Sequence, residues 1–183
     1  MLTISQFRPY VLRLMADGQT RHNSDIIKSV IHHCGLNNAQ QQEKLASGQT
    51  RAANRIGWAC SSFIKAGILI RPERGTYQIS DLGQKQAEKW QNTESISEKD
   101  LIGLPQWDDY QQSLRERKKN NAHTEIDEPD NDDKEPPDSI AMRAIQEIED
   151  QTAVEILSRL HNGTPAFFEL AVIQLLLAMG YGG

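Results

Sequence analysis

The chain has 183 residues, of which 38% are hydrophobic and 25% are charged, and this apolar content is low for one compact core of that length. No apolar run reaches the roughly 18 residues of a membrane span, and the first residues lack a secretory signal pattern, so we expect a cytoplasmic protein with no membrane partner. Residues 1–92 carry 12 Lys and Arg against 6 Asp and Glu, whereas residues 93–183 carry 8 against 19. This asymmetry indicates a first part that binds a polyanion and an acidic segment behind it.

Two amphipathic helices are predicted at the start of the chain. Pro9 suits the first position of a helix that ends at Gly18, and Ser24 is placed to cap a second helix that stops at Gly35. The polar run over residues 37–45 predicts a short extra helical turn.

The pattern then changes from helix to hairpin. A third helix is predicted over residues 51–66 with Gly67 as its left-handed stop, followed by strands at 68–70 and 76–79. Ser80 is placed to cap a fourth helix. Residues 1–92 therefore predict a mainly α fold with a small β-hairpin, a winged helix-turn-helix.

The rest of the chain divides into two parts. Residues 93–138 are predicted to be an acidic, largely disordered linker, although the apolar residues between 101 and 107 could pack back on the first domain. Helical periodicity returns over residues 139–183, with a break near Asp150 and a final helix that begins after Thr164. This last helix is apolar on nearly every side, so we expect it to pack against the preceding helix or to form a homodimer.

A winged helix binds double-stranded DNA by placing its third helix in the major groove while the wing contacts a neighbouring groove or the backbone. Arginine and asparagine can read guanine and adenine, and backbone N–H groups at a helix start favour phosphate. The candidate DNA-binding residues are Gln49, Thr50, Arg51, Asn54, Arg55, Arg71 and Arg74. Trp58 and Tyr77 are expected to pack between helix and wing rather than to stack on bases.

Two possible metal motifs are set aside. The run His32-His33-Cys34 would point its side chains in different directions around a helix, and it has no matching second pair of ligands. Asp130 and Asp132-x-Lys134 spell a fragment of a nuclease signature, but they lie in a proline-rich acidic run that cannot supply two adjacent strands. We expect no metal site and no catalytic residues, and the two cysteines are expected to be buried thiols.

Several segments together are more specific than a generic winged helix. They are Arg51 to Ala59, Ala66 to Tyr77 and Ile79 to Gly83, together with Thr164 to Glu169 and Met179 to Gly183. This sequence resembles the Mrr-like restriction endonucleases over residues 1–90 and again from Ser139. The resemblance implies a DNA-targeting domain followed by the first helices of a nuclease domain. In that family the Mg²⁺-dependent chemistry, an Asp and a Gln/Glu-x-Lys pair, comes after the position of Gly183.

The resemblance thus predicts the targeting part of a modification-dependent (type IV) restriction endonuclease. This part binds duplex DNA, either plain or methylated, and by itself holds no cofactor and cuts nothing. Two other interpretations fit the residues. One is a free-standing winged-helix transcription regulator whose C-terminal helices self-associate. The other is a protein-interaction module that uses the same face for a partner.

Overall fold

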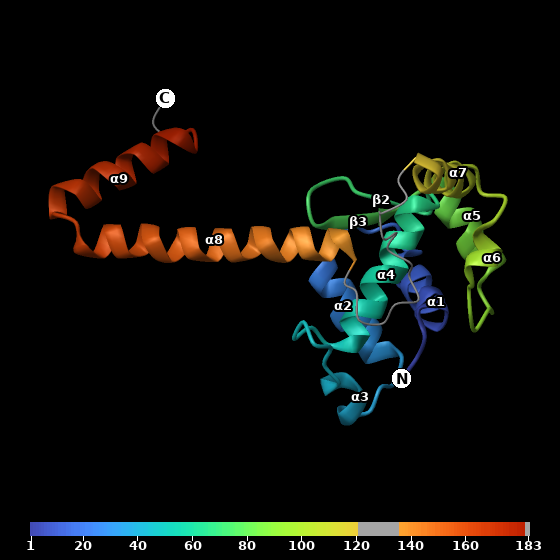
Figure 1. Ribbon diagram of the computed structural model, residues 1–183. Coiled ribbons are helices and arrows are strands. Elements are labelled where there is room, and N and C mark those ends of the chain that lie inside the picture. Colours follow the sequence, from blue (N-terminus) through green and yellow to red (C-terminus); the bar gives the residue numbers. More distant parts are fainter. Residues whose placement is uncertain (121–135, 182–183) are drawn as a thin grey trace. The chain divides into compact units, whose positions relative to one another are not determined.

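The computed structural model describes residues 1–120 and 136–181, and the chain divides into two compact units, residues 1–140 and 141–183. Figure 1 shows the elements of the chain. In the first unit they are α1 (Ile4–Met15), β1 (Arg21–His22), α2 (Asn23–His33), α3 (Asn38–Gln42), α4 (Arg51–Lys65), β2 (Leu69–Ile70), β3 (Thr76–Ile79), α5 (Asp81–Lys89), α6 (Glu98–Leu101) and α7 (Pro105–Asn120). Two helices follow, α8 (Pro137–Asn162) and α9 (Pro165–Ala178).

The first helix starts earlier than the sequence suggested. The Thr3 side chain caps α1, and Pro9 lies inside the helix, so its placement at the first helical position was wrong. Proline has no N–H with which to bind the carbonyl four residues before it, here that of Ser5. The Ser5 carbonyl instead accepts a hydrogen bond from the backbone N–H of Ile96, at 2.9 Å. The proline thereby leaves the Ser5 carbonyl on α1 as an acceptor for Ile96, 91 residues farther along the chain.

The sheet has three antiparallel strands in the order β1-β3-β2, rather than the two of the predicted hairpin. Arg21 of β1 lies opposite Tyr77 of β3, and Leu69 of β2 lies opposite Ile79. The first strand was missed because two residues are too few to show an alternating pattern. With β1 in place, the first unit has the helix, strand and wing order of a winged helix.

Several helices begin or end at the capping residues that the sequence predicts. Gly35 and Gly67 have φ of +66° and +71°, as expected for glycines that end helices, and the Ser80 side chain accepts from the Gly83 N–H to cap α5. The expected cap by Ser24 is wrong, because α2 begins at Asn23, two residues earlier than that cap implies, and His22 is its N-cap residue. The Ser24 hydroxyl lies 3.2 Å from Nδ1 of the His22 ring instead.

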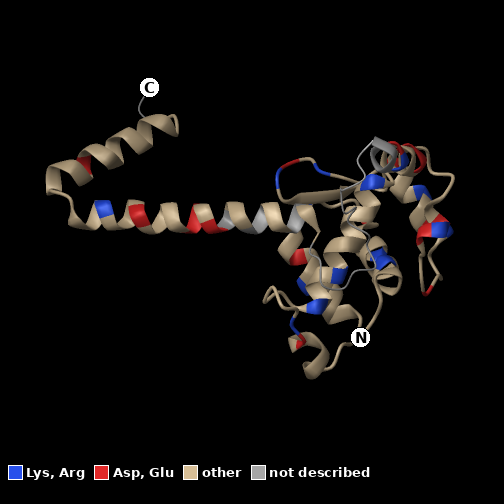
Figure 2. Ribbon diagram, in the orientation of Figure 1, with Lys and Arg blue, Asp and Glu red and all other residues tan. Residues whose placement is uncertain are grey.

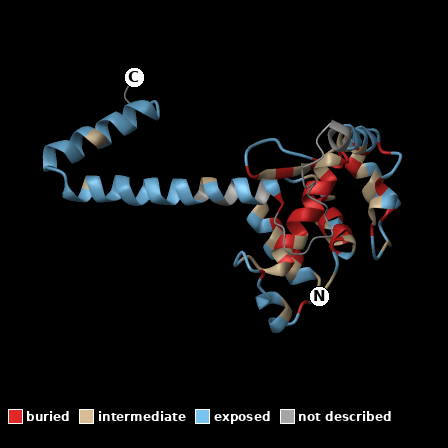
Figure 3. Ribbon diagram, viewed as in Figure 1, coloured by how far each residue is buried: buried red, intermediate tan, exposed pale blue. Residues whose placement is uncertain are grey.

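The hydrophobic core surrounds α4, which is mostly buried (Figure 3). Ile96, Leu101, Leu104 and Trp107 are also buried and belong to the same core cluster. These residues lie beyond Asn92, where the sequence suggested that the DNA-binding domain ends, and α7 continues the chain as a helix to residue 120. The core residues that pack the first unit therefore include part of the segment expected to be a disordered linker. The predicted linker also includes residues 121–135, which contain the Asp130 motif. These residues lie outside the described residues.

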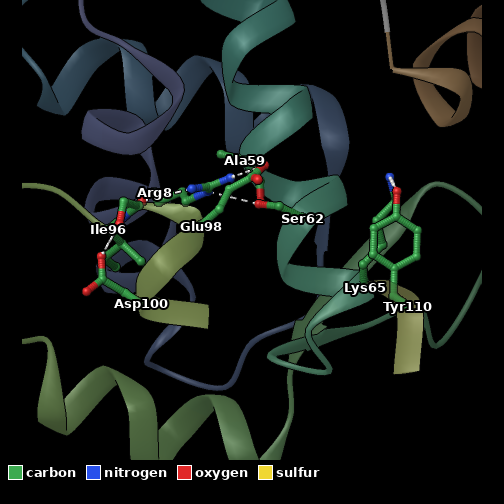
Figure 4. A network of polar contacts seen from close by, with 9 residues as sticks. Arg8, Ala59, Ser62, Lys65, Ile96, Glu98, Asp100 and Tyr110 are labelled. Atoms are coloured by element: carbon green, nitrogen blue, oxygen red, sulfur yellow. Dashed lines mark hydrogen bonds and ion pairs between the residues drawn. The ribbon is translucent and has the colours of Figure 1, made fainter. Parts of the chain in front are cut away.

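A buried arginine joins this late segment to the first helix (Figure 4). The Arg8 side chain is 1% exposed, and its Nε donates to the Ser62 hydroxyl on α4 at 3.0 Å. Its Nη1 donates to the Ile96 carbonyl at 2.9 Å, and its Nη2 lies 3.8 Å from the Glu98 carboxylate. A buried charge is tolerated when its donors have acceptors, and Arg8 finds them on two other parts of the chain.

The second unit consists of helices. The break expected near Asp150 is absent, since α8 runs unbroken and the Thr152 hydroxyl bonds back to the Ile148 carbonyl at 2.7 Å within the same helix. Thr164 caps α9 and Gly180 follows it with a positive φ, as predicted. No residue of α9 is buried, and its large apolar side chains are 38–60% exposed. Within the described residues, no helix is both long and apolar enough to cross a membrane.

Candidate nucleic-acid interface

The predicted recognition helix exposes little of its length. Ten of the 15 residues of α4 are buried, and its C-terminal end is covered, because Lys65 Nζ lies 3.0 Å from the Tyr110 hydroxyl on α7. Arg51 and Arg55, near the N-terminus, are half-buried. The surface that α4 can offer to DNA is therefore its first turn and a half.

A small hairpin precedes this exposed end. Lys44 and Thr50 form an isolated antiparallel bridge, and the Leu45 N–H donates to the Gln49 carbonyl at 2.9 Å. Between them the chain turns at Gly48, whose φ is +85°. Residues 43–50, here called the α4 hairpin, place Lys44 at the surface beside the start of α4.

Arg51, at the first position of α4, is held by the α4 hairpin. Its Nε donates to the Glu43 carboxylate at 2.7 Å, and its backbone N–H donates to the Glu43 carbonyl at 2.8 Å. The Thr50 side chain accepts from the Ala53 N–H, so Thr50 acts as the helix cap rather than as an open contact.

Two predicted base contacts have structural roles here. Asn54 is 1% exposed, and its side-chain amide donates to the Gln49 side chain at 3.3 Å. Arg55 Nη1 donates to the Leu2 carbonyl at 2.6 Å, which braces the N-terminal residues against α4. The structure thus places Gln49 and Asn54 against each other and directs Arg55 toward the start of the chain.

The wing carries the most accessible basic residues of the predicted set. Arg71 and Arg74 are both exposed in the turn between β2 and β3, and Figure 2 shows basic segments there and near the start of α4. The Arg71 guanidinium lies over the Tyr77 ring, 5.3 Å from its centre, which limits its rotation. Gly75 accepts a hydrogen bond from the Asn23 N–H at 3.0 Å, so the wing is anchored to the start of α2.

Comparison with known protein families decides what this winged helix is. A family model described as the Mrr N-terminal domain matches residues 5–89, which include α1 from its second residue, α2 to α5 and all three strands. Residues 5–89 therefore form an Mrr N-terminal domain. This confirms the resemblance seen in the sequence.

The chain is also a distant homologue of the type IV methyl-directed restriction enzyme EcoKMrr of Escherichia coli (strain K12). The two are 27% identical over 202 aligned positions, which cover 99% of this chain and 60% of the relative. The chain thus spans about three fifths of the length of that relative. No solved structure gives a significant match.

Beyond the Mrr N-terminal domain, the segment from Ile96 to Trp107 completes its core, as described above.

The tryptophan and tyrosine considered for base stacking, Trp58 and Tyr77, are 2% and 5% exposed and pack in that core, which confirms the packing interpretation. Lys44 and Glu43 were missed as candidates because a polar run gives no periodic signal that places them beside the third helix.

The cysteines of the Mrr N-terminal domain are both free thiols. Cys60 is fully buried, and loss of solvent raises its pKa to about 12, so it is inert as a nucleophile. Cys34 is half-buried, and burial raises its pKa as well. Among residues 1–120 and 136–181, no cluster of three His, Cys, Asp or Glu side chains could hold a metal ion.

Proposed function

We propose that this chain binds double-stranded DNA through its Mrr N-terminal domain, as the targeting part of a modification-dependent restriction endonuclease in the cytoplasm. The observation that carries the proposal is that the basic wing and the basic first turn of α4 belong to one winged helix of the Mrr type. Winged helices place these two elements against the major groove and the adjoining backbone.

Within this interface, the residues divide by role. Arg71 and Arg74 are exposed and suit phosphate contacts, and Arg51 stands where the first turn of α4 would enter the groove. Asn54 acts through the fold because it is buried against Gln49, and Arg55 does so because it binds the Leu2 carbonyl and braces the start of the chain. The wing arginines and Arg51 therefore form the interface to be tested.

The test is duplex affinity as a function of salt concentration, measured by fluorescence anisotropy. Replacing Arg51, Arg71 and Arg74 together by Ala should weaken binding strongly and flatten the slope of log K against log salt by about 2–3, because each lost phosphate contact removes about 0.9. A matched variant with Lys85, Lys89 and Lys99 changed to Ala removes three positive charges from α5 and α6, and it should retain most of the affinity and slope. Equal losses in both variants would mean that only net charge matters and that the docking face is wrong.

We further propose that these 183 residues bind DNA without cutting it. Metal-dependent nucleases of this kind need carboxylates on adjacent strands that converge on one cation, and the three strands of the described part of the chain carry none. Nicking of duplex by purified protein with Mg²⁺ or Mn²⁺, abolished by Asp130→Ala or Lys134→Ala, would overturn this.

The relative described as methyl-directed makes methylated DNA the substrate class to try first. Affinities for plain and methylated duplexes of one sequence, measured at equal salt, test it. Equal affinity for the two duplexes would show that this chain does not recognise methylation, while the proposal that it binds DNA would still stand.

A further inference from the structure

The start of α4 already holds a negatively charged group. The Glu43 carboxylate accepts a hydrogen bond from Arg51 Nε at 2.7 Å, at the end of the helix where the backbone dipole attracts anions. The Glu43 side chain is 42% exposed and that of Arg51 is 22% exposed, so this contact lies at the surface. It occupies the place where an Arg51 contact to a DNA phosphate would form.

Backbone donors at this end have acceptors within the chain as well. The Arg51 N–H donates to the Glu43 carbonyl, and the Ala53 N–H donates to the Thr50 hydroxyl. A phosphate arriving here would thus interact mainly with the Arg51 side chain rather than with a free helix end. The sequence alone suggested an open anion site at this position, whereas in the structure the Glu43 carboxylate already binds the Arg51 side chain there.

We propose that Glu43 is an intramolecular competitor of DNA phosphate for Arg51, so that duplex binding displaces the Glu43 carboxylate. This inference rests on the proposed function and names a regulating contact within that interface. By binding Arg51, Glu43 weakens the part of the affinity that comes from phosphate contacts, which is the same for every DNA sequence. Contacts that depend on sequence or modification then contribute a larger share of the total binding free energy.

The geometry allows this exchange without unfolding the α4 hairpin. Its shape is fixed by backbone bonds, from Arg51 to Glu43 and from Leu45 to Gln49, which do not involve the Glu43 carboxylate. An exposed ion pair adds little to stability, so a phosphate of the DNA polyanion can take the place of the carboxylate at small cost. Glu43→Gln should therefore remove the competing charge and leave the fold unchanged.

The experiment measures the affinity of the full chain for a plain duplex, across a range of salt, for wild type, Glu43→Gln and Glu94→Gln. Glu94 is an exposed acid in the segment before α6 and serves as a control for net charge. Glu43→Gln should bind about three- to tenfold more tightly at low salt, with a salt slope steeper by up to about one. Glu94→Gln should change affinity less than twofold, and both variants should keep the wild-type melting temperature.

A double-mutant cycle tests whether Glu43 affects DNA binding through Arg51. In an Arg51→Ala background, Glu43→Gln should give little gain, because the group for which it competes is absent. A full gain in that background, or a Glu43→Gln variant that binds no more tightly than Glu94→Gln, overturns the inference while wild-type binding upholds the proposed function. A Glu43→Gln variant that binds more weakly would make Glu43 a positioning residue, which also overturns it. If neither wild type nor variant binds duplex at low salt, the proposed function fails too.

Discussion

Arg8 carries a positive charge into the interior of the first unit, and its donors reach α4 and the segment before α6. Replacing it by Ala leaves the Ile96 carbonyl and the Ser62 hydroxyl with one partner fewer and opens a cavity. Each unsatisfied buried polar group costs about 1–3 kcal/mol. Arg8→Ala should therefore lower the free energy of unfolding by about 3–5 kcal/mol, measured by urea denaturation.

Arg13→Ala serves as the control for Arg8. Arg13 lies on the same helix and is exposed, with its guanidinium over the Tyr10 ring at 4.9 Å. Its loss should cost less than about 1 kcal/mol. Equal losses for the two arginines would show that the buried network adds nothing beyond a surface contact.

Asp17 gives the domain a measurable acid dependence. The hydrogen bonds from the Arg21 side chain lower the pKa of Asp17 to about 2, from about 3.9 in an unfolded chain. Because the folded pKa is the lower one, the stabilisation is complete above about pH 4 and disappears as the pH falls toward 2. Since Asp17 is exposed, solvent reduces this effect to about 0.5–1 kcal/mol.

Asp17→Asn should thus destabilise the protein by that amount at pH 6 and by much less near pH 2.5, as measured by denaturation at both pH values. A difference between wild type and variant that is the same at both would assign the effect of Asp17 to something other than its charge.

At the scale of elements, sequence patterns located α4, the wing and α5 because their signals are local: a cap residue, a glycine stop or a Pro-Gly turn. They missed β1, which exists only through pairing with β3. They also placed Arg51, Asn54 and Arg55 in one DNA-reading group. Their partners separate these residues: Asn54 is buried, Arg55 bonds to the Leu2 carbonyl, and Arg51 bonds to the Glu43 carboxylate. Such partners depend on which elements pack around α4, which no single helix pattern contains.

The segment from residue 93 to residue 107 is predicted to be required for a stable domain. Ile96, Leu101, Leu104 and Trp107 are all buried, and each large apolar side chain buried contributes about 1.5–3 kcal/mol. A fragment of residues 1–92 should accordingly be largely unfolded at 25 °C, while residues 1–120 should show a cooperative transition. Circular dichroism on thermal melting distinguishes them. Equal melting temperatures would mean that this segment only rests on a domain complete without it.

At the scale of the whole molecule, α9 presents apolar side chains on all sides, with Glu169 and Gln174 as its polar residues between Phe167 and Ala178. We predict that the 183-residue chain binds a hydrophobic dye or associates with itself, and that residues 1–120 do neither while still binding DNA. Light scattering and dye fluorescence on the two proteins measure this. A monomeric full chain that binds no dye would show that α9 is covered in solution by another part of the chain.

The carbonyl that accepts from Arg8 lies 88 residues farther along the chain, and this distance has a consequence for synthesis. At about 5–20 residues per second, a ribosome needs roughly 4–18 s to add those residues. During that interval the guanidinium of Arg8 has no acceptor at Ile96, and the core still lacks Ile96, Leu101, Leu104 and Trp107. Slower translation between residues 9 and 107 should therefore increase aggregation of the nascent protein without changing the stability of the finished one.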